Sequence, residues 1–347
     1  MITENMKAPA PPVGIIESLS LGFEAVAGRL LLALVPLAVD LFLWVGPRLD
    51  LRPVVENTIH ALIAETTAIS ARDAELQALQ ANLEEGLQTA TQNLPVSYLP
   101  LLGLPSLITG QAAQPLPFAY TPPLWRIETP AETLAAAGAA LGASLLLLTI
   151  YLSLIADQVQ AGRLQTVHRL KRLPVTVIQL VILGVLVLAI SLTLYLPFLL
   201  VGSRLAAAGG MGGQIGQIIT LGGLVFLLWV GLFGIFALHG LFLNERSLPG
   251  AIWDSIRVVQ WNTSATMGLF ILVIAINWAL TRYIWSWPDA SSWLILVGMI
   301  GHSFVSTGLV AATFVFFKDR HRYWQEMRSA LLAELERKRA GTMQGRQ

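Results

Sequence analysis

The sequence predicts an all-α, polytopic membrane protein with six transmembrane helices and a helical, Pro-rich extracytoplasmic insert. Of its 347 residues, 55% are hydrophobic and 12% are charged, whereas a typical soluble domain has about 25% charged residues. Several apolar runs approach or exceed the roughly 20 residues that cross a bilayer as a helix. A polar stretch, residues 47–130, separates the first of these runs from the others.

Residues 1–28 are expected to form a disordered N-terminus followed by an interfacial helix. The first twelve residues are rich in proline and alanine, which disfavours a packed core. Apolar residues then recur at helical spacing, with Glu17 and Glu24 among them, as in helices that lie on a membrane surface. The first span is expected at 29–46, with a kink at Pro36.

The insert, residues 47–130, has two parts. From Val54 to Leu94 one apolar column repeats every seven residues, but its partner column is largely polar, so an amphipathic helix or helical hairpin is expected rather than a coiled coil. Leu94–Ile108 combines three prolines with seven leucines and isoleucines. It is too broken to span lipid and too apolar for a solvated loop, so we expect it to pack on helices or enter the headgroup layer.

Residues 131–317 are expected to form the remaining five spans. Thr129 as N-cap, Pro130 at the first helical position and Glu132 two residues later make a capping box that begins the second span. Short glycine pairs within the spans are typical of close helix packing. The five spans are expected at 134–155, 175–201, 218–243, 267–284 and 293–317, with a cytoplasmic interfacial helix at 248–260 and a basic cytoplasmic tail helix at 318–347.

The distribution of lysine and arginine predicts the orientation, because cytoplasmic loops carry an excess of both. The insert has four arginines against eight acidic residues, whereas the link between the second and third spans has four basic residues and the tail has eight. Both termini are therefore expected in the cytoplasm and the insert outside. The expected location is the bacterial cytoplasmic (inner) membrane, crossed several times.

Three polar residues within the apolar segments form a candidate intramembrane site: Asp40, Asn277 and His302. A carboxylate inside a membrane costs about 2.5–3.5 kcal/mol on insertion scales, so it is expected to face protein or water and to have a partner. A site for a proton, an ion or a small solute is one interpretation. The alternatives are that Asp40 is solvated near the outer interface or pairs with a basic residue of the insert, and that Asn277 and His302 make ordinary interhelical hydrogen bonds.

Four basic residues are candidates for contact with anionic lipid headgroups, because each basic group near a charged surface contributes about 1 kcal/mol. The positive-inside bias alone explains them equally well. They are Arg163, Arg169, Lys171 and Arg172.

The chemistry of known enzyme motifs is not evident. The chain has no cysteine, which excludes disulfides and thiolate metal sites, and its net charge of +1 gives no reason to expect nucleic acid as a partner. No spacing typical of a metal site, phosphate loop or nucleophile–base pair occurs, so no metal or cofactor is expected. The expected partner is the lipid bilayer, together with a membrane or extracytoplasmic protein.

The region from Phe236 to Arg322 resembles the closing part of bacterial multi-span membrane proteins related to the membrane domain of glycerophosphodiester phosphodiesterases. The residues that carry the resemblance are Leu243–Ser247, Ala251–Ser255 and Phe316–Arg320, with two spans between the second and third motifs. The resemblance covers about a quarter of the chain. It implies an all-helical membrane fold and nothing about substrate.

Three functions are compatible with these observations. The first is a non-enzymatic membrane component that engages a protein partner or lipid through the insert. The second is a transporter or permease subunit that uses the intramembrane polar residues. The third, a lipid-modifying intramembrane enzyme, requires acid–base groups clustered near one interface.

Overall fold

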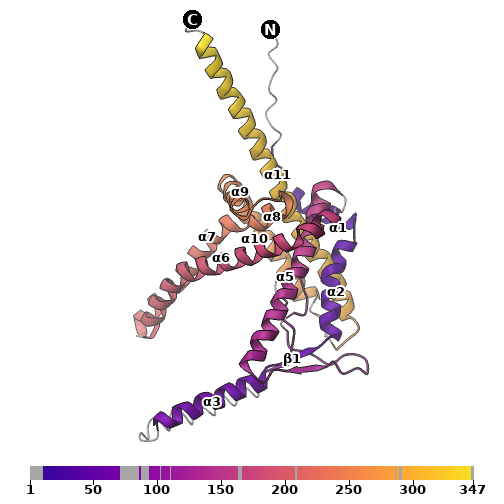
Figure 1. The fold of residues 1–347 in the computed structure, drawn as a ribbon, viewed down its shortest axis with the longest axis vertical. Helices are drawn as coiled ribbons and strands as arrows, with labels where there is room; N and C mark the ends of the chain where they lie inside the picture. Colours follow the sequence, from indigo (N-terminus) through magenta and orange to yellow (C-terminus); the bar gives the residue numbers. More distant parts are fainter. Residues whose placement is uncertain are drawn as a thin grey trace. The chain divides into compact units, whose positions relative to one another are not determined.

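The computed structural model describes residues 11–70, 86, 94–101, 103–109, 111–162, 166–207, 209–285, 287–288 and 291–344. The chain divides into two compact units. Unit 1 consists of Met1–Arg29, Thr149–Ile276 and Gly308–Gln347, and unit 2 consists of Leu30–Leu148 and Asn277–Thr307. Both units are mostly helical (Figure 1).

Among the described residues, five helical stretches are long and apolar enough to cross a membrane, which confirms the predicted class of helical multi-pass membrane protein. A sixth is obtained when α1 (Ile15–Ala27) and α2 (Leu31–Val45) are counted together as one bent span. The five are Pro130–Ala161, Lys171–Ala207, Gly210–Leu243, Thr263–Trp285 and Ile295–Glu336.

The insert contains a small sheet, which the prediction of an all-α fold missed. Strand β1 (Arg48–Asp50) lies in the centre, antiparallel to β2 (Ser97–Tyr98) and parallel to β3 (Leu124–Arg126). Strands of two or three residues are too short to show the alternation by which a strand is recognised. The predicted helix is present as α3 (Arg52–Ser70), while residues 71–85 and 87–93 of that prediction lie outside the described residues.

A small apolar core joins this sheet to the start of α5 (Pro130–Ala161). Leu49, Val54 and Ile127 are buried together, and Ala136 of α5 packs against them. The predicted capping box is confirmed. Thr129 Oγ1 accepts a hydrogen bond from the Glu132 N–H at 3.2 Å, and Glu132 Oε2 accepts one at 2.8 Å from the N–H of Glu128, one residue before the N-cap.

Unit 1 contains the hairpin of α6 (Thr166–Ala207) and α7 (Gly210–Gly234), which lie side by side (Figure 1). Gly209 and Gly210 make the turn with φ of 67° and 54°, a backbone conformation that glycine adopts at little cost. Gly202 and Gly216 bring the two backbones together, since a Cβ on Gly216 would lie only 2.6 Å from the Ala206 nitrogen.

The predicted fourth span, 218–243, is not one straight helix. It consists of α7 and α8 (Ala237–Leu243), which are separated at Ile235 and Phe236. Ser255 of α9 (Leu248–Trp261) compensates the break. Its Oγ accepts a hydrogen bond from the Phe236 N–H at 3.0 Å and donates one to the Phe233 carbonyl at 2.7 Å.

The C-terminal half contains α10 (Thr263–Leu280), the π-helical turn η1 (Thr281–Trp285) and α11 (Ile295–Gln344). The predicted sixth span and tail helix form this one 50-residue helix, because no glycine or proline interrupts the chain between them. In unit 1, Gly22 of α1 packs on Ala312 of α11, where an added Cβ would lie 2.6 Å from the Ala312 Cα.

The glycine pairs differ in how closely they pack. In unit 2, Gly298 and Gly301 of α11 lie directly against Trp285, as the small-residue pattern predicts. At Gly138, Gly142, Gly231 and Gly234 an added Cβ would meet no described atom within 4 Å. These four therefore do not mark close packing within the described part of the chain.

Candidate functional site

Asp40 of α2 is fully buried and holds the Leu94–Ile108 segment of the insert. The Leu107 N–H donates to both carboxylate oxygens, at 3.0 and 3.1 Å, and the Ser106 hydroxyl donates to Oδ1. The expectation that the Pro/Leu-rich segment packs on a helix is met here. Among the described residues, Asp40 accepts hydrogen bonds from the Ser106 hydroxyl and the Leu107 N–H and does not pair with a basic residue of the insert.

The loop that carries Ser106 is held in shape by its own polar groups. Ser106 Oγ accepts a hydrogen bond from the Thr109 N–H at 3.1 Å. Thr109 Oγ1 donates to the Leu99 carbonyl and accepts from the Leu101 N–H, both at 3.1 Å. Leu107 and Ile108 are buried. These hydrogen bonds within the loop hold the Ser106 hydroxyl and the Leu107 N–H in position to donate to Asp40.

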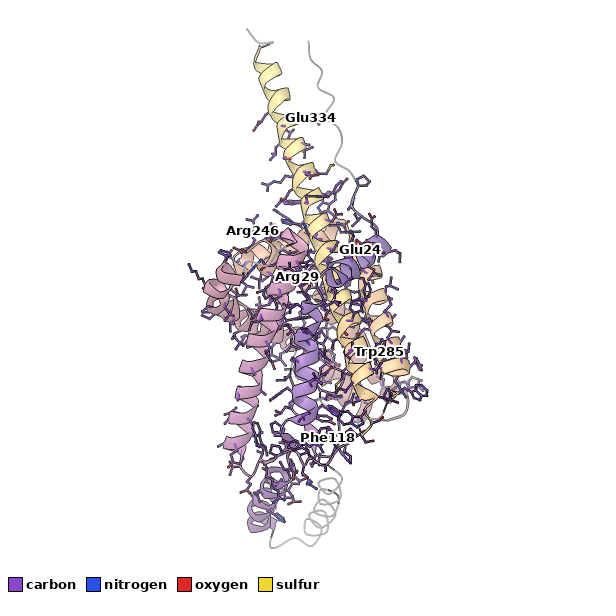
Figure 2. All side chains as sticks on the ribbon, turned by 90° about the vertical axis from the view of Figure 1, so that its right-hand side faces the viewer. Glu24, Arg29, Phe118, Arg246, Trp285 and Glu334 are labelled. Atoms are coloured by element: carbon purple, nitrogen blue, oxygen red, sulfur yellow. The ribbon has the colours of Figure 1, made fainter. Side chains whose placement is uncertain are left out.

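A second contact, within unit 2, joins the insert to α2 and to Trp293. The ring of Phe118, which is labelled in Figure 2, packs edge-on against Trp44 at the end of α2, with 5.8 Å between centroids. It also stacks on Trp293 at 5.2 Å. Trp44 and Trp293 are themselves 6.0 Å apart. Aromatic pairs of this geometry contribute about 0.5–1.5 kcal/mol beyond the burial of their area.

The structure brings two of the three predicted intramembrane site residues together. Ser306 Oγ donates to Asn277 Oδ1 at 3.3 Å and lies 3.3 Å from His302 Nε2. Thr281 Oγ1 is 3.3 Å from the other ring nitrogen of His302. Within the described ranges of unit 2, no hydrogen bond connects Asp40 with this chain of polar groups.

The basic residues between the second and third predicted spans are engaged inside unit 1. Arg169 forms a 2.8 Å ion pair with the buried Asp157 and donates to the Phe242 carbonyl at 2.8 Å. Arg172 pairs with Glu245. Lys171 is exposed and remains a candidate for headgroup contact, whereas Arg163 lies outside the described residues.

Glu245 is the centre of this ion-pair network. Burial raises the pKa of its carboxyl, but the His168 hydrogen bond and the charges of Arg172 and Arg169 outweigh this effect and hold the pKa below its usual value. Its φ of 49° lies in the left-handed region, which costs a residue other than glycine roughly 1–2 kcal/mol. The ion pairs with His168 and Arg172 tie the turn between α8 and α9 to α6.

A second group of charges, which sequence reasoning missed, lies after this turn. Asp254 of α9 is 3.2 Å from His321 Nε2 and 3.7 Å from Arg246 Nε. Asn244 Nδ2 lies 3.4 Å from His321 Nδ1. The pairing joins residues about 70 positions apart, so the only signal in the sequence was the presence of charges beside apolar positions on α9.

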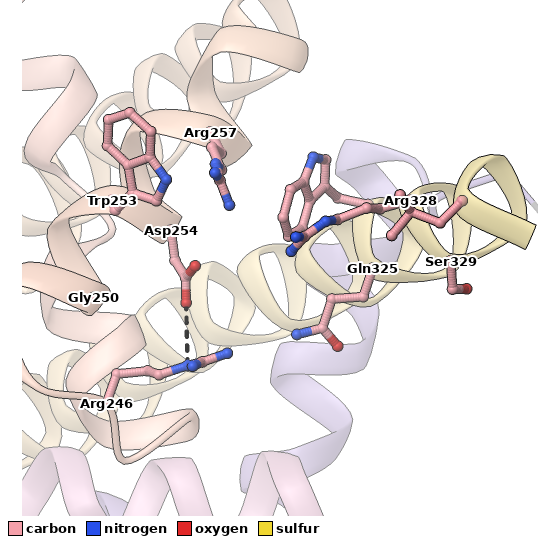
Figure 3. Close-up of a pocket in the computed structure, with 10 residues that line it drawn as sticks. Arg246, Gly250, Trp253, Asp254, Arg257, Gln325, Arg328 and Ser329 are labelled. Atoms are coloured by element: carbon pink, nitrogen blue, oxygen red, sulfur yellow. Dashed lines mark ion pairs between the residues drawn. The ribbon is translucent and has the colours of Figure 1, made fainter. Parts of the chain in front are cut away.

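Arg246 and Asp254 also line a cavity of about 450 Å³ between α9 and α11. Trp253 and Arg257 of α9 and Arg328 of α11 complete its polar and aromatic walls (Figure 3). Within the described ranges, no group of three or more histidine, aspartate and glutamate side chains is arranged to hold a metal ion.

The chain matches no protein-family model, no curated protein and no solved structure. The resemblance of Phe236–Arg322 to the membrane domain of glycerophosphodiester phosphodiesterases therefore remains an expectation. Its three motifs do meet in the structure, since Asn244, Asp254 and His321 lie in or beside them and contact one another.

Proposed function

We propose that this chain is a non-enzymatic membrane component that engages a protein partner or a lipid surface through its insert. The proposal includes six spans of a bacterial cytoplasmic membrane, both termini inside and the insert outside. The observation that carries it is the hydrogen bonding of the buried Asp40 to Ser106 and Leu107. Placing a carboxylate there is costly, and a segment that only connected two spans would not need it.

The lysine and arginine distribution supports the orientation. The insert is acidic in balance, and the α5–α6 link and the residues after Phe317 are basic, as expected for a cytoplasmic side. The insert would then be held on the outer face at two points, Asp40 and the Phe118 ring.

The sheet of the insert supplies the surface with which a partner is expected to bind. Strand β3 lies at an edge of the sheet, and all three of its residues are exposed. An edge strand presents unpaired backbone groups that a peptide can extend. Leu124 and Trp125 add apolar area there, and tryptophan is also the residue that anchors proteins in the headgroup layer.

The absence of cysteine allows a direct test. A photo-crosslinker attached to cysteine in Trp125→Cys, on β3, is compared with one attached in His60→Cys, on the exposed face of α3. In native membranes we expect a protein or lipid adduct that is enriched at position 125. Equal adducts at both positions, or none at 125, would contradict the proposed role of the sheet edge.

The Asn277–Ser306–His302 chain supports a second candidate, a transporter or permease subunit. Polar side chains inside a bundle mark a solute pathway when they line a water-filled cavity. The variant Ser306→Cys separates the possibilities, because a charged methanethiosulfonate reagent reacts only with a thiol that water reaches. Modification of the thiol at position 306 within minutes would favour transport. Full protection of this thiol from the reagent would favour an interhelical hydrogen-bond cluster instead.

A further inference from the structure

The cavity between α9 and α11 has an excess of positive charge. Three arginines line it, Arg246, Arg257 and Arg328, against one carboxylate, Asp254. Three positive charges and one negative charge leave an excess of two. Asp254 is already paired with Arg246 and His321. Within the part of the chain that the structure describes, neither Arg257 nor Arg328 has a carboxylate partner.

Two tryptophans position the unpaired guanidinium groups. The Arg257 guanidinium lies between Trp253 and Trp324, 4.9 and 4.7 Å from the two ring centroids. Arg328 lies over the same Trp324 ring at 5.6 Å. Stacking occupies the faces of a guanidinium and leaves its N–H edges free to donate. Arg257 is thereby held ready for a carboxylate or phosphate acceptor that the described residues do not supply.

The side chains converge on one space. Figure 3 shows Arg246 and Arg257 reaching it from the α9 side, and Gln325 and Arg328 reaching it from α11. Several forked donors around one point are suited to a tetrahedral oxyanion, which accepts two parallel hydrogen bonds from each guanidinium. The volume of about 450 Å³ lies within the range of small-molecule sites.

We propose that this cavity binds a phosphate-bearing anion, either as the headgroup of an anionic lipid or as a phosphate ester in solution. Trp324 follows Phe317, the end of the apolar run of α11, by seven residues, which is about 10 Å along a helix. The headgroup layer is about 5–8 Å thick on each side of a bilayer, so Trp324 would lie just outside it, and the long arginine side chains beside it can reach back to a headgroup. Trp253, Trp324 and Leu332 supply apolar surface for the organic part of the ligand.

This site does not depend on the proposed role of the insert, because the residues that line it all belong to unit 1. It also differs from the basic residues of the α5–α6 link, where Arg169 and Arg172 are paired with acids. The two proposals can therefore fail separately.

The test measures binding to the purified full chain by native mass spectrometry with three probes: phosphatidylglycerol, glycerol 3-phosphate and inorganic phosphate. Phosphatidylcholine serves as the zwitterionic reference. Arg257→Ala and Arg328→Ala each remove one unpaired cation, and we expect each to weaken binding about fivefold or more. Arg257→Lys keeps the charge but loses the planar fork and the stacking, so it should also weaken binding.

Arg322→Ala is the matched control. It removes one positive charge from α11, the helix that carries Arg328. Arg322, however, pairs with Asp319, is 65% exposed and does not line the cavity. A lipid headgroup is identified if the wild type binds phosphatidylglycerol more tightly than the soluble probes, and if this binding is lost in the cavity variants and kept in Arg322→Ala. The same pattern with the soluble probes identifies a free phosphate ester. Equal losses in the control and cavity variants, or no preference over phosphatidylcholine with any probe, would overturn the proposal. Thermal unfolding shows whether each variant is folded. If Arg257→Ala is not folded, the binding of Arg328→Ala decides the test, because Arg328 is an exposed position.

Discussion

The Leu107 N–H donates to both carboxylate oxygens of Asp40, at 3.0 and 3.1 Å, across 67 positions of sequence. Replacing Asp40 with leucine would leave this buried N–H and the Ser106 hydroxyl without an acceptor. An unsatisfied buried donor costs about 1–3 kcal/mol, so we expect Asp40→Leu to lower the free energy of unfolding by that amount. Hydrogen exchange of residues 103–109 should become faster.

Asp40→Asn is the matched control for this prediction, because the amide keeps one oxygen that accepts a hydrogen bond at a similar place. We expect a smaller loss of stability and a smaller change in exchange. If exchange of residues 103–109 is the same in wild type and Asp40→Leu, the carboxylate does not hold the loop.

The orientation of the chain leads to a second prediction. Thr121 lies in the insert and Ser329 on α11 beyond its apolar run, and both are exposed. With no native cysteine, each can carry the only thiol. In intact spheroplasts we expect a membrane-impermeant maleimide to label Thr121→Cys at once and Ser329→Cys only after permeabilisation. Labelling of both without permeabilisation, or the reverse pattern, would exclude the proposed topology.

The α6–α7 hairpin leads to a third prediction. A Cβ at Gly216 would approach the Gly202 carbonyl and lie 2.6 Å from the Ala206 nitrogen, both of them backbone atoms. Overpacking of this kind costs about 1–3 kcal/mol, so Gly216→Ala should lower the thermal unfolding temperature in detergent.

Gly222 of the same helix provides the comparison, because an added Cβ would meet no described atom within 4 Å there. Gly222→Ala should be neutral or should stabilise by up to about 1 kcal/mol, since alanine has the higher helix propensity. Equal effects of the two substitutions would mean that α6 and α7 do not pack through Gly216.

Local signals predicted much of the fold. The long apolar runs, the interfacial helix α9 and the Thr129–Glu132 capping box each depend on residues near one another in sequence, and each is present in the structure. The break between α7 and α8 could not be predicted in this way. Ser255, which satisfies the freed backbone groups, is about 20 positions away.

In the candidate site, too, the features that depend on neighbouring residues could be predicted and the tertiary contacts could not. Asp40 and the Pro/Leu-rich segment were each recognisable as unusual, but their pairing is a tertiary contact. Asp254 and His321 are ordinary residues in their own helices, and only the packing of α9 on α11 makes them a buried pair. Predicting such a pair requires knowing which helices contact each other, and the pattern of apolar residues does not give this information.

The depressed pKa of Glu245 leads to the last prediction. A carboxyl whose pKa is lower in the folded state than in the unfolded state, about 4.3, stabilises the fold at higher pH. This contribution is complete above the unfolded pKa and is lost as the pH falls through the folded pKa. The stability difference between wild type and Glu245→Gln should therefore shrink as the pH falls from about pH 5 to pH 3.

Thermal unfolding of the two proteins in the same detergent, from pH 7 to pH 3, measures this difference. Taking the difference removes the contributions of other acids, such as Asp50, whose pKa is lowered by its hydrogen bond with Arg52. Arg172→Gln supplies the control, because removing a cation beside Glu245 should move the pKa of Glu245 back toward its usual value. Adding Glu245→Gln to Arg172→Gln should therefore change the stability less than adding it to the wild type does. A difference that does not shrink between about pH 5 and pH 3 would show that the carboxylate of Glu245 does not stabilise the α8–α9 turn by its charge.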